Sequence, residues 1–323
     1  MPDDVTFLTK PQIALQLIDE SVADGIQVKG WTFDEGYGRD GHFLDGLDDR
    51  RLAFVGEVPP AFHVWMSKPK VLQKPARNTI GRQKRYPRLR RRERVGNEAQ
   101  NLSKYSPGFR EQKPQLYRVR DSHKGPEIWE VRWHVCYRKT HQAGLVSSQC
   151  TLIVARNIRT GDVKYFLSNR VPGRGGWTVR ELLRIAFARW KVEACFREAK
   201  EELGWDHFEC RGWGCVHRHL TATIVAQLFC ARIRQRLSPS EIVTDAERLT
   251  MEQVRRAADV FISSLDLPPR LRHERYRAAW QRIRYHQIRN AEASISHRKR
   301  RLAAYHAMGI DPDGIKSVEE KPT

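Results

Sequence analysis

A stretch near the middle of the chain, RWKVEACFREAKEELG at residues 189–204, combines residue types that could bind a metal ion or a phosphate. On a helical wheel, Arg189, Glu193, Arg197 and Lys200 fall on one narrow polar stripe. Glu193 and Arg197 are four positions apart, which is the spacing of an ordinary surface ion pair that contributes little to stability. The alternative is that Glu193 binds a divalent cation, because Mg²⁺ prefers carboxylate oxygens.

A second carboxylate follows a predicted strand in TFDEGYG, where Asp34 opens a glycine-rich turn. Taken alone, an aspartate in such a turn usually shapes the turn. Taken together with Glu193, it could supply the second ligand of a site that cuts and rejoins phosphodiesters. That chemistry uses two Mg²⁺ ions to activate the attacking oxygen and to stabilise the leaving one. Asp34 at a strand end and Glu193 on a helix packed against the sheet are suitable donors.

The spacing of Arg189, Glu193 and Lys200 resembles the pattern Y-(2)-R-(3)-E-(6)-K of bacterial insertion-sequence transposases of the DDE superfamily. The tyrosine position of that pattern is Ala186 in this chain. The TFDEGYG segment resembles the same family's strand-end aspartate and Gly-Tyr-Gly turn, and the segment YHQIRNAEASISHRKRRL resembles one of its subgroups. The similarity runs from Phe7 to about Gly309.

The resemblance implies a fold, an activity and a set of partners. The fold would be an α/β, ribonuclease-H-like core with a β-rich insertion and a helical C-terminal region. Asp34 and Glu193 would be catalytic ligands of a two-Mg²⁺ site, and Arg189, Arg197 and Lys200 would contact DNA. The substrates would be terminal inverted repeats and target DNA, and a homodimer is possible. The location would be the bacterial cytoplasm, at the nucleoid.

The family's first aspartate and its leading strands have no counterpart in the residues before Asp34. We therefore expect a core that is incomplete because the chain is truncated at its N-terminus, with an incomplete metal site. Little strand-transfer activity is expected from this polypeptide alone, together with marginal stability or reliance on a partner.

The charge balance favours a polyanionic partner. The chain has 58 Lys and Arg residues against 38 Asp and Glu, a net charge of +20 and a pI near 10. Between Lys68 and Arg94 the only acid is Glu93, and Arg88, Arg90, Arg91 and Arg92 cluster beside Tyr86. This segment is either a solvated loop or a surface that follows a nucleic-acid backbone. No apolar run is long enough to span a membrane, and no signal-peptide pattern opens the chain.

The N-terminal pattern predicts alternating helices and strands. A helix is expected over residues 9–23, with Thr9 and Gln12 as a capping box. A strand over 25–33, a turn over 34–41, a helix over 42–49 and a strand over 51–58 follow. This alternation favours a parallel α/β layer.

The rest of the chain divides into a β-rich part and a helical part. Strands are predicted at 115–120, 128–139, 149–157 and 163–169, joined by turns at HKGPE and TGD. A helix is expected from Arg180, opened by a capping box of Thr178 and Glu181, and a further helix is expected over 216–237. The helix that carries Glu193 is expected to bury the stripe Ile185, Ala188, Val192, Cys195, Phe196, Ala199 and Leu203. The predicted segments are 1–58, 59–170, 171–237, a basic helical region at 238–310 and a disordered tail at 311–323.

Three other interpretations compete with the transposase. A zinc site could use Cys210, Cys215, His217 and His219, although His217, Arg218 and His219 fit better as groups that face phosphate or cap a helix. A non-catalytic basic nucleic-acid-binding protein would explain the charge, but not the two acids. A membrane-surface protein fits only the charge. The six cysteines form no C-x-x-C pair and are read as reduced thiols.

Overall fold

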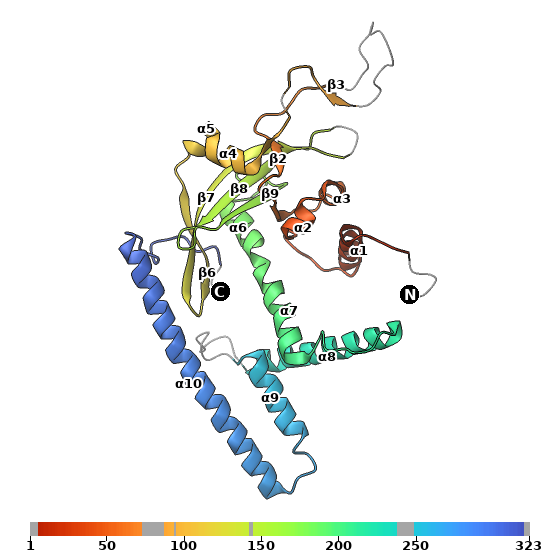
Figure 1. Cartoon of the computed structure of the whole chain (residues 1–323), viewed down its shortest axis with the longest axis vertical. Helices are drawn as coiled ribbons and strands as arrows, with labels where there is room; N and C mark the ends of the chain where they lie inside the picture. Colours follow the sequence, from red (N-terminus) through yellow and green to blue (C-terminus); the bar gives the residue numbers. More distant parts are fainter. Residues whose placement is uncertain (1–5, 73–86, 94, 142–144, 238–248, 320–323) are drawn as a thin grey trace. The chain divides into compact units, whose positions relative to one another are not determined.

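The computed structural model describes residues 6–72, 87–93, 95–141, 145–237 and 249–319 (Figure 1). The chain forms two compact units, each assembled from separate stretches of sequence. The sheet unit contains residues 3–120, 127–189 and 311–323, and the helical unit contains residues 1–2, 121–126 and 190–310. The five segments expected from the sequence remain predictions.

A mixed α/β arrangement with a largely antiparallel sheet makes up the sheet unit. Among the described residues, seven strands form one sheet in the order β1-β9-β8-β7-β2-β5, with β6 beside β7. The strands are β1 (Val55–Val58), β2 (His63–Trp65), β5 (Asn97–Glu98), β6 (Gln115–Ser122), β7 (Gly125–Arg138), β8 (Cys150–Asn157) and β9 (Val163–Ser168). The four long strands expected over 115–169 are thereby confirmed, as are the turns at HKGPE and TGD.

The parallel layer expected near the N-terminus is present only as a short parallel backbone pairing. Residues 25–33 form no strand, and only Trp31 makes an isolated parallel bridge, to Phe54. The bridge is extended by a hydrogen bond from the Glu57 amide to the Phe33 carbonyl at 3.0 Å. β1 itself pairs with β9 in the antiparallel sense. Upstream, Ile26 and Val28 are about half exposed, so no burial holds this segment in an extended ladder.

Both faces of the sheet are covered, because successive side chains of a strand point to opposite sides. On β8 and β9, Leu152 and Leu167 join one core, whereas Ile153 and Phe166 join the other. The first core also includes residues from α1 (Lys10–Ala23), α3 (Gly41–Asp49), α4 (Ala99–Tyr105) and α5 (Pro107–Arg110). The second is covered by α6 (Val179–Ala188). The capping boxes predicted for α1 and α6 are both present.

The C-terminal tail is ordered as far as it is described, contrary to the expected disorder. The Val318 amide donates to the Arg118 carbonyl at 2.8 Å, and the Arg118 amide donates to the Lys316 carbonyl at 3.0 Å. Val318 is 1% exposed in the second core. One apolar side chain and a short backbone pairing along β6 therefore hold this segment, while residues 320–323 lie outside the described residues.

The helical unit contains α7 (Trp190–Leu203), α8 (Trp213–Leu237), α9 (Met251–Ile262) and the long α10 (Pro269–Ala307). Its buried core is small and centres on Cys230, Met251 and Val254. Ion pairs join α7 to its neighbours, from Glu198 to Arg234 at 3.7 Å and from Glu202 to Arg255 at 3.3 Å. Within the described stretches, no helix combines the length and apolarity that crossing a membrane requires.

The tip of the β6–β7 hairpin belongs to the helical unit and is anchored on α10. The Arg301 guanidinium donates to the Gly125 carbonyl at 2.9 Å, and the Tyr305 hydroxyl donates to the Pro126 carbonyl at 3.0 Å. Both side chains are buried. These hydrogen bonds satisfy turn carbonyls that burial would otherwise leave without partners.

The cysteine thiols should differ sharply in reactivity. Cys136 and Cys150 lie opposite each other on β7 and β8, and both are fully buried. Burial raises the pKa of Cys150 to about 11 and that of Cys136 well above its usual range. Cys195 and Cys215 are exposed.

We therefore expect iodoacetamide at pH 8 to alkylate Cys195 and Cys215 in the native protein, because the thiolate is the reactive form. Cys136 and Cys150 should be labelled only after unfolding in urea. Peptide mass spectrometry gives the extent at each site. Rapid native labelling of Cys150 would contradict the buried pair.

Candidate functional site

Asp34 stands where the chain passes from the bridge beside β1 into α2, a single helical turn (Glu35–Gly38). It is the N-cap of this turn, and its Oδ1 accepts a hydrogen bond from the Tyr37 amide at 3.3 Å. The side chain is half-buried, and the preceding Phe33 is in the core. Within the described residues, Oδ2 accepts no hydrogen bond. One carboxylate oxygen is thus oriented by the backbone, and the other remains available to a ligand.

The close approach of α2 to β1 sets the position of Asp34. A Cβ atom on Gly38 would lie 1.9 Å from the Glu57 carbonyl oxygen. A Cβ atom on Gly56 would lie 1.8 Å from the ring of Phe33. Both positions therefore require glycine for close packing. Together they hold the segment around Asp34 directly against the backbone of β1.

Glu57 is a half-buried acid that the sequence analysis did not identify. Its carboxylate lies 2.9 Å from the Lys164 ammonium on β9 and 3.6 Å from the Arg189 guanidinium, and 17% of the side chain is exposed. Arg189, expected to contact DNA, is thus held beside this acid at the end of α6. The pairing of β1 with β9 brings Glu57 and Lys164 together, and no local pattern signals that pairing.

The Glu193 helix differs from its expected packing. The helix announced by Thr178 is interrupted at Arg189, so Glu193 lies in the first turn of a separate helix, α7. Val192 and Phe196, both expected in the buried stripe, are 50% and 47% exposed. Cys195 is exposed too, whereas Ile185 and Ala199 are buried as expected.

Part of this exposure has a physical reason, because Phe196 stacks on Trp205 with ring centroids 5.2 Å apart rather than entering a core. Glu193, Arg197 and Lys200 are exposed on α7. Asp34 belongs to the sheet unit and Glu193 to the helical unit. That the carboxylates of Asp34 and Glu193 lie close enough to share a cation therefore remains a prediction.

No metal centre is assembled from the side chains that the structure describes. Across those ranges, no three His, Cys, Asp or Glu side chains are grouped so as to hold an ion. Of the residues considered as zinc ligands, His219 has its Nε2 atom 2.9 Å from the Gly204 carbonyl oxygen. His217 packs on Trp213, with ring centroids 4.4 Å apart. His217 and the neighbouring Arg218 are both exposed near the start of α8.

The basic segment is described only in part, because residues 73–86 and 94, including Tyr86, lie outside the described residues. Its ends form a small hairpin of β3 (Val71–Leu72) and β4 (Arg88–Leu89). The Arg90 amide donates to the Lys70 carbonyl at 2.9 Å, which continues this pairing. Arg90, Arg91 and Arg92 are exposed, whereas Arg88 is half-buried. A hairpin that presents arginines suits phosphate contacts, which remain a prediction for Arg88, Arg90, Arg91 and Arg92.

Comparison with known proteins places the first part of the chain in a class of nuclease. Residues 1–126 match the family described as DDE superfamily endonuclease. The match contains Asp34, the α2 turn and Glu57, and it ends before Glu193. A search of curated proteins found no match. The family match indicates a transposase-like nuclease that acts on DNA.

Proposed function

We propose that the chain is a DNA transposase of a bacterial insertion sequence, which cleaves and transfers DNA strands with the help of a divalent cation. Asp34 and Glu193 are the proposed ligands, and terminal inverted repeats and target DNA are the proposed substrates. The observation that carries the proposal is the position and hydrogen bonding of the Asp34 carboxylate. Its carboxylate is fixed by a helix N-cap against β1, retains one oxygen for a ligand, and lies inside the residues that match the nuclease family.

The donor chemistry fits Mg²⁺. This ion is commonly bound through one or two carboxylates and completes its octahedron with water and substrate phosphate oxygens. Asp34 and Glu193 could therefore bind such an ion together with water and phosphate, although no group of three possible ligands is assembled in the described ranges and the site stays incomplete by comparison with the resemblance. When bound, such ions activate the attacking oxygen and stabilise the leaving one. The ribonuclease-H-like arrangement belongs to the same proposal.

The surrounding cations support the proposed handling of DNA. Arg197 and Lys200 are exposed on the same helix as Glu193, where they could contact the phosphate backbone near the reacting bond. Arg189 is different, because Glu57 already lies beside it. We propose that Arg189 chiefly positions the start of α7 and that Arg197 and Lys200 contact DNA.

The proposal is tested by measuring whether Asp34 and Glu193 share an ion. Tb³⁺ binds oxygen sites and luminesces when a nearby tryptophan is excited, and Trp31 and Trp190 each lie three positions before one of the acids. Asp34→Asn and Glu193→Gln should each weaken Tb³⁺ binding by about tenfold or more, or about 1.4 kcal/mol. Mg²⁺ should displace the Tb³⁺ competitively.

The double variant distinguishes one shared site from two separate ones. If both acids hold the same ion, the double substitution should cost clearly less than the sum of the single effects. Asp40→Asn is a matched control, because Asp40 caps α3 as Asp34 caps α2. Glu201→Gln is the control on α7. The proposal would be contradicted if the effects of the two substitutions on Tb³⁺ affinity were additive, or if neither substitution changed that affinity.

The second candidate function is a basic nucleic-acid-binding protein without catalysis. The arginine-bearing hairpin of β3 and β4 and the strongly basic α10 favour it. Such a protein should bind DNA equally well with and without Mg²⁺, and with or without the two acids. The Tb³⁺ titration therefore separates the two candidates.

A further inference from the structure

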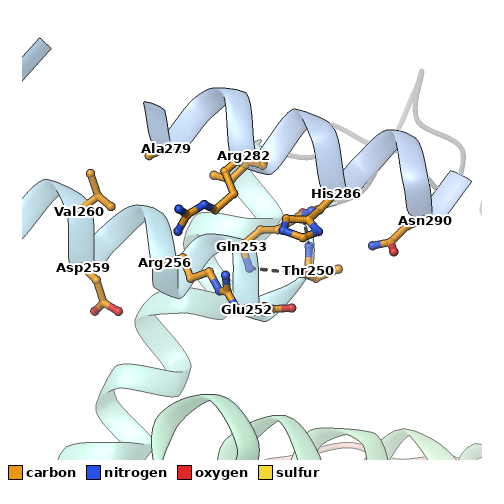
Figure 2. A pocket seen from close by; sticks show the side chains of 11 residues that line it. Thr250, Glu252, Gln253, Arg256, Asp259, Val260, Ala279, Arg282, His286 and Asn290 are labelled. Atoms are coloured by element: carbon orange, nitrogen blue, oxygen red, sulfur yellow. Dashed lines mark hydrogen bonds and ion pairs between the residues drawn. The ribbon is translucent and has the colours of Figure 1, made fainter. Parts of the chain in front are cut away.

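A cleft of about 450 Å³ runs between α9 and α10 inside the helical unit, and neither Asp34 nor Glu193 is among its lining residues (Figure 2). The two helices form a hairpin whose connection is pinned by arginines of α10. Arg272 donates to the Leu265 carbonyl at 2.7 Å, and Arg275 donates to the Ser263 carbonyl at 3.0 Å. These bonds satisfy carbonyls at the end of α9. The cleft walls are therefore held together at the connection between the helices.

The described residues that line this cleft include two acids, Glu252 and Asp259, and two arginines, Arg256 and Arg282. Its two acids are each paired already with an arginine of α9. Glu252 lies 2.6 Å from Arg256, and Asp259 lies 2.5 Å from Arg255. Arg282 on α10 makes no ion pair or hydrogen bond within the described part of the chain. The charges of the lining balance in number, but the N–H donors of Arg282 are left without a direct partner among the described residues and can bind an anion.

Hydrogen-bond donors from both helices line the same space. Figure 2 shows the side chains of Arg282 and His286 extending from α10 toward the α9 residues. Gln253 is 7% exposed, and its Oε1 accepts the Thr250 amide at 3.0 Å, so its NH₂ group remains a donor. Arg256 and Asn290 add further donors at the margins. A guanidinium, an imidazole and an amide around one space suit the oxygens of a phosphate.

The lining also indicates which kind of phosphate ligand fits. Among the described residues that line the cleft, His286 alone is aromatic and could stack on a nucleotide base. Eight of its eleven described lining residues are polar or charged, and it opens on the surface of a helix with many arginines. These features suit a backbone phosphate, which is recognised by charge and hydrogen bonds, better than a free nucleotide.

We propose that the cleft between α9 and α10 binds a phosphodiester group of the DNA backbone, with Arg282, His286 and Gln253 as its donors. This inference rests on the proposed action on DNA and adds a second contact region to it. Binding here fixes the register of the duplex on the helical unit and reads no base sequence. The contact is independent of the divalent cation.

The experiment measures binding of the full-length chain to a labelled duplex by fluorescence anisotropy at several salt concentrations, in EDTA. Loss of one phosphate contact lowers the slope of log K against log [salt] by about 0.9. Arg282→Gln should show this change and bind about five- to tenfold more weakly at low salt. Adding His286→Ala should weaken binding further. Because Arg282 and His286 are exposed, both proteins should keep the wild-type Tm.

Arg277→Gln is the matched control, because it removes the same charge from the same helix outside the cleft. It should leave the slope unchanged. If Arg282→Gln keeps the wild-type slope, or if Arg277→Gln lowers the slope equally, the cleft is not the phosphate site. The Tb³⁺ titration is a separate measurement. A negative result for DNA binding at the cleft would therefore leave the proposed ion site of Asp34 and Glu193 unaffected, and a negative Tb³⁺ result would leave the cleft proposal unaffected.

Inorganic phosphate distinguishes the two sources of this ligand chemistry. In a second arm, ³¹P line broadening reports binding of inorganic phosphate to the wild type and to Arg282→Gln. Weaker broadening with Arg282→Gln, together with the loss of DNA affinity, supports a backbone contact. Phosphate binding that depends on Arg282, with unchanged DNA binding, would overturn the assignment to DNA in favour of a free anion.

Discussion

Replacing Arg138 by alanine is expected to lower the free energy of unfolding of the sheet unit by about 3–5 kcal/mol. Arg138 is fully buried at the end of β7. Its guanidinium lies 2.5 Å from Asp45 and 2.6 Å from Asp48, both on α3. Burial acts to lower the pKa of Arg138, but the charges of Asp48 and Asp45 outweigh it and raise the pKa above its ordinary value.

The cost arises mainly from what the substitution leaves behind. Asp45 is 4% exposed, and its second oxygen accepts the His141 amide at 2.7 Å. Asp48 accepts a hydrogen bond from Asn169 at 2.8 Å. Without Arg138, the Asp45 carboxylate would be buried with no opposite charge, which is more costly than losing a surface pair. The network also joins α3, which follows the Asp34 turn, to the centre of the sheet.

Urea unfolding followed by tryptophan fluorescence measures this effect. The matched control is Arg132→Ala, because Arg132 is on the same strand and pairs with Glu130 at 3.3 Å, but is 32% exposed. That pair should contribute about 0.2–1 kcal/mol. Adding Asp45→Asn to Arg138→Ala should recover part of the loss, because it removes the unpaired charge. Equal effects of the two arginine substitutions would show that burial of Arg138 is not the cause.

Gly38→Ala should disrupt the Asp34 turn and reduce both stability and metal binding. The new methyl group would lie 1.9 Å from the Glu57 carbonyl oxygen, an overlap that a backbone atom cannot relieve by changing rotamer. The α2 turn must therefore move away from β1, at a cost of about 1–3 kcal/mol or more. Because Asp34 caps this turn, Tb³⁺ affinity should fall as well.

Gly214→Ala is the control for this prediction. Gly214 lies in the first turn of α8, and the nearest neighbouring atom is 3.7 Å from the position of an added Cβ. Alanine should be tolerated there and could stabilise the helix by up to about 1 kcal/mol. Thermal unfolding and Tb³⁺ titration of both variants give the two measurements. A Gly38→Ala protein with wild-type Tm and affinity would show that α2 does not depend on this close contact.

Local features of the fold were readable from the sequence. The capping boxes at Thr9 and Thr178 depend on residues three positions apart, so they are visible without any tertiary information. The strands over 115–169 follow from their β-branched and aromatic residues and from the turn residues between them. The position of Asp34 at a turn was also evident, and the family match to residues 1–126 is consistent with the resemblance found there.

Only the tertiary structure decided which strand lies beside which, and therefore which charges meet. The pairing of β1 with β9 places Lys164 beside Glu57, and the packing of α3 on β7 buries Arg138 between two aspartates. Val318 enters a core formed by residues far from it in sequence. The hydrophobic periodicity and the capping residues of a segment specify its secondary structure. Strand order and buried ion pairs depend instead on contacts between elements separated by a hundred residues or more, such as the contact between Glu57 and Lys164. A single sequence carries no local signal for such contacts, because their free energy exists only once both elements have folded together.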